Sequence, residues 1–125
     1  EPLAPTVPGI LVTDCQDISM CNVSVVGGFL RGIGVRRSAC SIVKCAIKGA
    51  VEDGVYVEGL HSKVRIEDTD IVGCKHGVWV TAAHPIIKGN RFADNGMHIH
   101  VATKNAMPII RGNAMSSSDR TDITD

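Results

Sequence analysis

Two histidines in the last third of the chain have residue types and a spacing that could bind a metal ion. His98 and His100 lie two positions apart, so on a strand both would project from the same outer face. That spacing can chelate zinc or copper when a third ligand converges, and Cys74 and His76 are the nearest candidates. Two ligands without a closed set are a weak signal. We therefore predict no metal and no other cofactor, and we expect His98 to replace a strand glycine.

An acidic cluster is the second group with possible chemistry. Glu67, Asp68 and Asp70 lie close to Arg65, with Glu52 and Asp53 earlier in the chain. Paired carboxylates can act as acid and base at a glycosidic bond or bind calcium. Strand alternation, however, places Arg65 and Glu67 on an outer face, with Glu67 beside Lys88 of a later strand. Solvated ion pairs between strands account for such charges. We predict no catalytic residue.

The only tyrosine and the only tryptophan are the strongest candidates for a binding surface. Tyr56 and Trp79 each stand third in a unit that reads Gly-apolar-x-apolar, so we expect both on the outer face of one sheet. Exposed aromatic rings on a rigid sheet can stack on a sugar or anchor a protein partner, unless a loop or a flanking domain covers them. The predicted binding surface consists of Tyr56, Trp79, His98, His100, Arg36 and Glu58.

An internal repeat supplies the strands that carry these residues. The unit Gly-apolar-x-apolar begins at residues 9, 32, 54 and 77, and a degenerate fifth copy covers residues 98–101. A second pattern, in which one apolar residue follows another after five positions, runs half a period out of phase. Its members are Ile18/Val23, Ile42/Ile47, Ile66/Ile71, Ile87/Phe92 and Ile110/Met115. Two interleaved patterns that keep step over five copies indicate a solenoid.

The composition selects the kind of solenoid. The chain has 15 Val and 13 Ile but only 4 Leu, which excludes a leucine-rich repeat and favours strands. A period of 21–24 residues is too short for a propeller blade, whereas it suits one coil of a right-handed parallel β-helix. We predict an all-β, right-handed parallel β-helix of about five coils. Two inward ladders follow, Ile10–Ile33–Val55–Val78–Ile99 and Val12–Val35–Val57–Val80–Val101.

The turns have their own expected residues. We expect the glycine that starts each unit to adopt positive φ where the chain enters the strand. Asn90 and Asn113 would stack at one turn, with Cys21, Cys45 and Thr69 at the equivalent positions of earlier coils. The predicted boundaries are a proline-rich lead-in at 1–8, the β-helix at 9–118 and a polar tail at 119–125.

Charge and cysteine content limit the partners and the compartment. Lys plus Arg and Asp plus Glu both number 13, which argues against nucleic acid and an anionic membrane surface. No apolar stretch approaches the roughly 20 residues that a membrane span needs. Five cysteines without a Cys-x-x-Cys spacing indicate reduced thiols, and hence a cytoplasmic protein.

From Gly32 to about Met115 the chain resembles the β-helix repeats of the pectate-lyase-like superfamily. The phrase Ala83-His84-Pro85-Ile86-Ile87-Lys88-Gly89-Asn90, followed by Asn95-Gly96, is similar to the repeat NP-x-I-x-x-N-x-I-x-x-N-x-x-G-I-x-V of its carbohydrate-binding and sugar-hydrolase class. The Gly-His-Gly and Arg-Ile-Lys signatures of polygalacturonases are absent. Among its members, the chain is closest in style to the intracellular β-helix F-box proteins and the SHC-binding spindle proteins. That resemblance implies protein recognition rather than catalysis.

Three functions are compatible with this sequence. We expect a non-catalytic interaction or scaffold module within a larger intracellular protein or assembly. A carbohydrate-binding or polysaccharide-degrading β-helix, a lyase or hydrolase that uses the same aromatics as a sugar platform, is the first alternative. A structural segment that self-associates through its open coil ends is the second, because uncovered sheet edges invite pairing.

Overall fold

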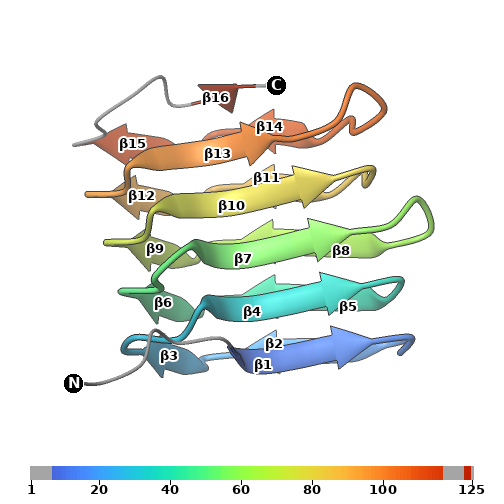
Figure 1. Ribbon diagram of the computed structural model, residues 1–125, viewed down its shortest axis with the longest axis horizontal. Coiled ribbons are helices and arrows are strands. Elements are labelled where there is room, and N and C mark those ends of the chain that lie inside the picture. The colour runs from blue at the N-terminus through green and yellow to red at the C-terminus, as the bar shows by residue number, and fades with distance from the viewer. Residues whose placement is uncertain (1–6, 117–122, 125) are drawn as a thin grey trace.

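The computed structural model describes residues 7–116 and the backbone of residues 123–124, and every regular element in these ranges is a β-strand. The strands form three parallel sheets that stack coil upon coil (Figure 1). Sheet A contains β1 (Pro8–Thr13), β4 (Arg31–Arg36), β7 (Asp53–Glu58), β10 (His76–Thr81), β13 (Met97–Val101) and β16 (Ile123–Thr124). Sheet B contains β2 (Ile18–Cys21), β5 (Ala39–Val43), β8 (Lys63–Glu67), β11 (Ile86–Lys88) and β14 (Ile109–Arg111). Sheet C contains β3 (Ser24–Val26), β6 (Ala46–Lys48), β9 (Asp70–Val72), β12 (Arg91–Ala93) and β15 (Ala114–Ser116). The predicted five-coil β-helix is confirmed.

The interior is built from ladders of like side chains. In sheet A, Val35 pairs with Val57 and Val57 with Val80, and all three are fully buried. The neighbouring ladder, from Ile33 to Ile99, has the predicted register as well. β-Branched side chains suit these positions because each packs on its equivalent one coil above and below.

The second apolar pattern is wrong by two residues in the first coil. Met20 pairs with Ile42, and Val25 pairs with Ile47, whereas the sequence pattern assigned Ile18 and Val23 to these positions. The strand alternates with a period of two, so a shift of two residues keeps the same face inward. The unbranched Met20 concealed the register, because its side chain fills a site that isoleucine fills in the later coils.

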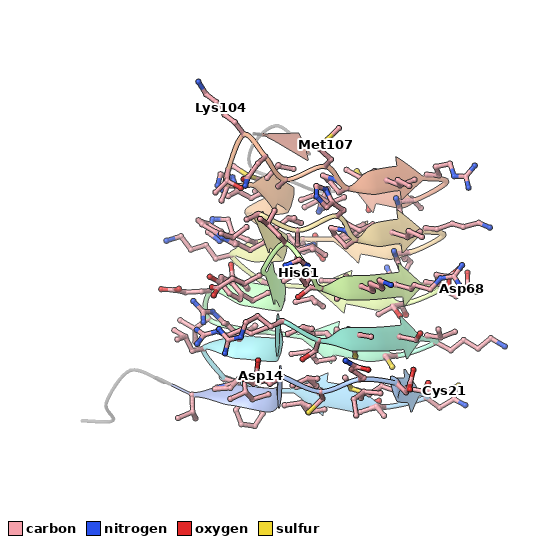
Figure 2. All side chains as sticks on the ribbon, turned by 90° about the vertical axis from the view of Figure 1, so that its right-hand side faces the viewer. Asp14, Cys21, His61, Asp68, Lys104 and Met107 are labelled. Atoms are coloured by element: carbon pink, nitrogen blue, oxygen red, sulfur yellow. The ribbon has the colours of Figure 1, made fainter. Side chains whose placement is uncertain are left out.

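Residues in the left-handed region of backbone conformation mark all three corners. The corner between sheets B and C has one such residue in every coil: Asn22, Lys44, Asp68, Gly89 and Gly112. The corner between A and B has Asp14, Arg37, Gly59 and Ala82, and the corner between C and A has Gly27, Gly49, Gly73 and Asp94. Up to the fourth coil their amides donate to carbonyl oxygens of the next coil, except that the Ala82 amide donates to Thr103 Oγ1, and these bonds keep the corners in register. Asp14 and Asp68 lie at two of these corners (Figure 2).

Buried polar side chains extend the stacking through the corners. Asn90 Oδ1 accepts from the Thr69 amide, and Asn90 Nδ2 donates to the Ile66 carbonyl oxygen, each at 2.9 Å. Asn113 repeats this arrangement one coil later. Cys45 belongs to this ladder as predicted, but Cys21 does not, because Cys21 pairs with Val43 and is exposed.

The glycines that start the sheet A strands are required for space, and the expected positive φ is wrong. A Cβ on Gly54 would lie 2.7 Å from the Gly77 carbonyl oxygen and 2.8 Å from Ile71 Cγ2. Gly32 has the same close approach to the next coil. Only a residue without a side chain lets the corner between sheets C and A close this tightly.

The predicted end segments fall largely outside the described residues. The lead-in at 1–8 is described only from Val7, and β1 already includes Pro8. Of the polar tail at 119–125, only the backbone of β16 is described, and it pairs with β13. In the described ranges no helix is present that could cross a membrane.

Candidate functional site

The outer face of sheet A brings together five of the six predicted surface residues. Trp79 pairs with Tyr56 on one side and with His100 on the other, and Arg36 pairs with Glu58 in the neighbouring ladder. The five residues belong to β4, β7, β10 and β13, which are consecutive strands of sheet A (Figure 1). The repeat thus places the aromatic side chains on adjacent strands, as predicted.

A third ladder on this face, Arg31–Asp53–His76, was missed by the sequence analysis. Regular alternation from Val55 would point Asp53 into the interior. In sheet A, Asp53 and Val55 pair with the adjacent strands, whereas Gly54 between them does not. A Cβ on Gly54 would point toward the core, as the Val55 side chain does. Asp53 therefore lies on the outer side. Each member of this ladder directly precedes a repeat glycine, and that shared position was the available signal.

Asp53 is the electrostatic centre of the site. Its side chain is almost fully buried, with one oxygen 3.3 Å from Arg31 Nε and the other 3.0 Å from His76 Nδ1. Burial raises the pKa of the Asp53 carboxyl group, and the interactions with His76 and Arg31 oppose that rise. The carboxylate fixes the orientation of both neighbours, because each contacts a different oxygen.

Tyr56 is held in place by charged neighbours. The Arg31 guanidinium lies 3.8 Å from the Tyr56 ring centroid, and the hydroxyl group donates to Glu58 Oε1 at 2.6 Å. Burial and the adjacent Glu58 carboxylate raise the pKa of Tyr56. The guanidinium covers one face of the ring, and the ring is therefore rigid and only partly accessible.

Trp79 is similarly immobilised by two imidazole rings. The His76 ring meets it edge-on at 4.9 Å between centroids, and the His100 ring lies at 4.3 Å. The indole N–H donates to Thr81 Oγ1 at 2.8 Å. Burial lowers the pKa of His100, and the nearby His76 contributes in the same direction. The aromatic cluster thus satisfies its polar tips internally and keeps its carbon surface outermost.

The expectation that His98 lies on this outer surface is wrong. Its side chain is 0% exposed, and Nδ1 lies 3.0 Å from Asn95 Nδ2. His98 stands at the strand-start glycine position, as predicted, and that position faces the interior. Its ring packs against Phe92 at 5.7 Å between centroids. The correction removes His98 from the binding surface and separates it from His100.

No group of three metal-ligating side chains occurs among residues 7–116. His76 lies near His100, with ring centroids 5.7 Å apart, but Cys74 is buried and burial raises the pKa of its thiol. A raised pKa keeps the thiol protonated, whereas a metal ligand must be a thiolate.

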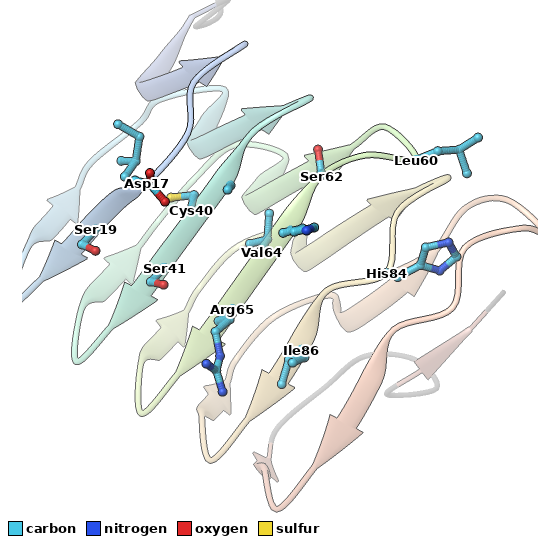
Figure 3. A pocket seen from close by; sticks show the side chains of 13 residues that line it. Asp17, Ser19, Cys40, Ser41, Leu60, Ser62, Val64, Arg65, His84 and Ile86 are labelled. Carbon is cyan, nitrogen blue, oxygen red and sulfur yellow. The ribbon is translucent and has the colours of Figure 1, made fainter.

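A second concave surface, the sheet B groove, lies across β2, β5, β8 and β11. It is an open depression of about 670 Å³, and small outward side chains such as Ser19 and Ser41 form its floor (Figure 3). Leu60 and His84 stand at its rim, on the loops between sheets A and B. Its polar side chains are spread along the groove and do not converge on one point, so they do not define a ligand class.

The acidic cluster forms one ion pair within β8 of sheet B and one between β9 and β12 of sheet C. Arg65 Nε lies 3.3 Å from Glu67 Oε2, and Arg91 Nε lies 3.3 Å from Asp70 Oδ1. Glu67 also pairs in register with Lys88, as predicted. Exposed pairs of this kind contribute little to stability, about 0–1 kcal/mol each.

Comparison with known proteins agrees with the coil architecture. A family model of the right-handed β-helix region matches residues 29–124. Neither the curated proteins nor the solved structures gave a significant match. The matched segment covers most of the chain and includes four of the five complete coils. The chain therefore belongs to the right-handed β-helix family.

Proposed function

We propose that this β-helix is a non-catalytic interaction module and that the outer face of sheet A binds a protein partner. The observation that carries the proposal is the rigid cluster of Tyr56, Trp79 and Arg31. Tryptophan, tyrosine and arginine are the residues most enriched where interfaces concentrate their binding energy. Side chains that are already immobilised lose little conformational entropy when a partner docks.

The same face supports a sugar platform less well. A sugar ring stacks on an open aromatic face, but the Arg31 guanidinium occupies one face of Tyr56 at 3.8 Å. The imidazole rings of His76 and His100 also contact Trp79, at 4.9 and 4.3 Å between ring centroids. A carbohydrate-binding function remains the alternative, because Tyr56 and Trp79 lie on adjacent strands at about the 4.8 Å strand spacing.

Free thiols favour a reducing compartment for this module. All five cysteines are unbridged, and Cys40, Cys45 and Cys74 are buried. Burial raises the pKa of Cys40 to about 11, so this thiol stays protonated and unreactive at neutral pH. We include a cytoplasmic location in the proposal on this ground.

A display selection tests the protein-binding function. Random peptides would be selected against the purified chain and then measured against Trp79→Ala and against Arg65→Ala, a control on sheet B. We expect the selected peptides to bind Trp79→Ala at least tenfold more weakly, a loss of about 1.4 kcal/mol or more, and to bind Arg65→Ala unchanged. His100→Ala gives a second readout at the site, in case Trp79→Ala does not fold.

A glycan array with the same variants completes the test. Glycans that bind the native chain and lose binding in Trp79→Ala would overturn the proposal and establish the carbohydrate alternative. Peptides that bind all variants equally would also overturn it, because the binding surface would then lie elsewhere.

A further inference from the structure

A small pocket borders the aromatic cluster of sheet A at Gly34. It has a volume of about 160 Å³ and lies between Leu11 on β1 and Tyr56 on β7. Gly34 stands between Leu11 and Tyr56 in the outward ladder Leu11–Gly34–Tyr56–Trp79–His100, and its missing side chain leaves the gap. The pocket is lined by Pro8, Leu11, Leu30, Arg31, Gly34, Arg36 and Tyr56. We call it the Gly34 pocket.

The fold does not require a glycine at this position. Gly34 lacks a positive φ, and a Cβ added there would meet only Leu11 Cδ1, at an ordinary contact distance of 3.5 Å. Gly32 differs, because a Cβ there would lie 2.6 Å from a backbone oxygen. A strand glycine weakens a sheet, and it often marks a place where a ligand approaches closely. Neither backbone conformation nor packing therefore requires a glycine at residue 34, and its effect is to leave a gap in the outer surface of sheet A.

Two guanidinium groups flank the Gly34 pocket. Arg31 and Arg36 lie 3.8 and 5.9 Å from the Tyr56 ring centroid. The Arg31 contact with Asp53 uses Nε, and the guanidinium has further N–H donors beyond that one. In the part of the chain that the structure describes, Arg36 makes no ion pair. The neighbouring Glu58 carboxylate accepts from the Tyr56 hydroxyl group.

The shape and donors of the pocket define a ligand class. Arginine presents a planar fork of N–H groups that matches a carboxylate, and two forks on either side of a gap favour one anionic group between them. The volume exceeds the roughly 30 Å³ of one water molecule several times. Such a space accommodates a short side chain, with Leu11 and the Tyr56 ring against its methylene groups.

We propose that the Gly34 pocket binds the carboxylate side chain of an aspartate or glutamate presented by a protein partner. This inference rests on the proposed function, because it assigns the partner of the same face. The pocket opens directly beside Tyr56, so a polypeptide with its carboxylate between Arg31 and Arg36 would continue over the aromatic cluster. A free small carboxylate would leave that cluster uncovered.

The probe for this proposal is N-acetyl-glutamate N-methylamide, with the uncharged glutamine analogue as its matched control. The full chain, labelled with ¹⁵N, would be titrated with each compound and followed by the backbone amide of Gly34 and the Nε–H groups of Arg31 and Arg36. We expect saturable shifts with the glutamate compound and none with the glutamine compound.

Three variants locate the binding. Arg36→Gln removes the arginine that makes no ion pair. Gly34→Leu introduces a side chain at the pocket, and its Cβ would meet only Leu11 Cδ1, at 3.5 Å. We expect both to weaken glutamate binding at least tenfold. Arg37→Gln is the matched control, because Arg37 is adjacent in sequence but pairs with Asp14 at the exposed corner, and it should bind as the native chain does. Equal shifts for both compounds, or undiminished binding in Arg36→Gln, would overturn the proposal.

Two further ligands distinguish the source of the anion. Tighter binding of inorganic phosphate or of glucuronate than of the glutamate compound would overturn the assignment to a protein side chain. The outcome is also separable from the proposed function. Selected peptides that depend on Trp79 but not on Arg36 would disprove the Gly34 pocket and leave the protein-binding face intact. Glutamate binding without any Trp79-dependent peptide would refute the protein partner itself.

Discussion

Nδ1 of His76 lies 3.0 Å from Oδ1 of Asp53, across two adjacent coils, on a carboxyl group that is 2% exposed. Arg31 contacts the other oxygen from the coil on the opposite side. Asp53 thus links three consecutive strands of sheet A through one side chain. Burial removes water from this carboxyl group, and its hydrogen bonds to Arg31 and His76 replace that hydration only in part. The loss of hydration and the gain from these partners together determine how stability depends on pH.

The first prediction concerns the sign of that response. Burial raises the pKa of Asp53 above 3.8, so the folded chain binds this proton more tightly than the unfolded chain. The contribution of Asp53 to folding is then fully present below about pH 4 and is lost as the pH rises through the folded pKa. The difference in unfolding free energy between the native chain and Asp53→Asn, measured by urea unfolding, should fall as the pH rises from below 3.8 through the raised pKa of the folded state.

Asp14→Asn is the control with the opposite sign. The hydrogen bond from Arg37 lowers the pKa of the exposed Asp14 carboxyl group, so its contribution is present above pH 3.8 and disappears as the pH falls through the folded pKa. A rising difference for Asp53→Asn over the same range would show that the ion pairs outweigh burial.

The second prediction concerns His100. Its pKa is lowered mainly by burial and next by the electrostatic interaction with His76. The Cε1 proton of His100, followed by NMR, should titrate with a midpoint below 6.5. His76→Ala should raise that midpoint only in part, because burial remains. A native midpoint at or above 6.5 would contradict the partly buried position of His100 beside Trp79.

The third prediction concerns the amide ladder. Asn90→Ala removes the acceptor of the Thr69 amide and the donor to the Ile66 carbonyl oxygen, at a site that is 1% exposed. Two buried backbone groups lose their partners, so we expect a loss of about 2–4 kcal/mol in the free energy of unfolding. Asn90→Thr should recover part of it, since Thr69 accepts from the Cys45 amide one coil earlier. Equal losses in both variants would indicate that cavity formation dominates.

The fourth prediction separates two glycines. Gly54→Ala places a Cβ 2.7 Å from the Gly77 carbonyl oxygen, and the resulting strain should cost about 1–3 kcal/mol or more. Gly34→Ala introduces no collision and reduces the freedom of the unfolded chain, so it should change stability by less than about 1 kcal/mol, in the stabilising direction. Denaturant unfolding of both variants measures the contrast. Similar losses would mean that Gly34 is structural after all.

Period and alternation were sufficient to predict the coils and most of the aromatic face. Val35, Val57 and Val80 recur because each coil needs a β-branched side chain at the same inward site, and the register of Tyr56 and Trp79 follows from theirs. A pattern based on like residues fails where the residue type changes, and Met20 therefore concealed the register of the first coil.

The charged part of the site could not be found from alternation. Asp53 reaches the outer face because Gly54 and Val55 both turn inward, a local break in the period of two that only the close approach of neighbouring coils explains. The same break explains the error at His98, whose side chain occupies the inward glycine position of its coil. Sequence periodicity therefore assigns the wrong face to residues beside a break in strand alternation, such as Asp53 and His98.

The corner between sheets A and B accepts loops of different lengths. Ile66 follows Val57 by nine positions, whereas Ile42 follows Val35 by seven, yet both pairs keep the same register in their sheets. The extra length forms the loop with Leu60 and His61 (Figures 2 and 3). Added residues at this corner therefore enlarge the rim of the sheet B groove and leave the aromatic face undisturbed. One side of the solenoid can diversify independently of the other.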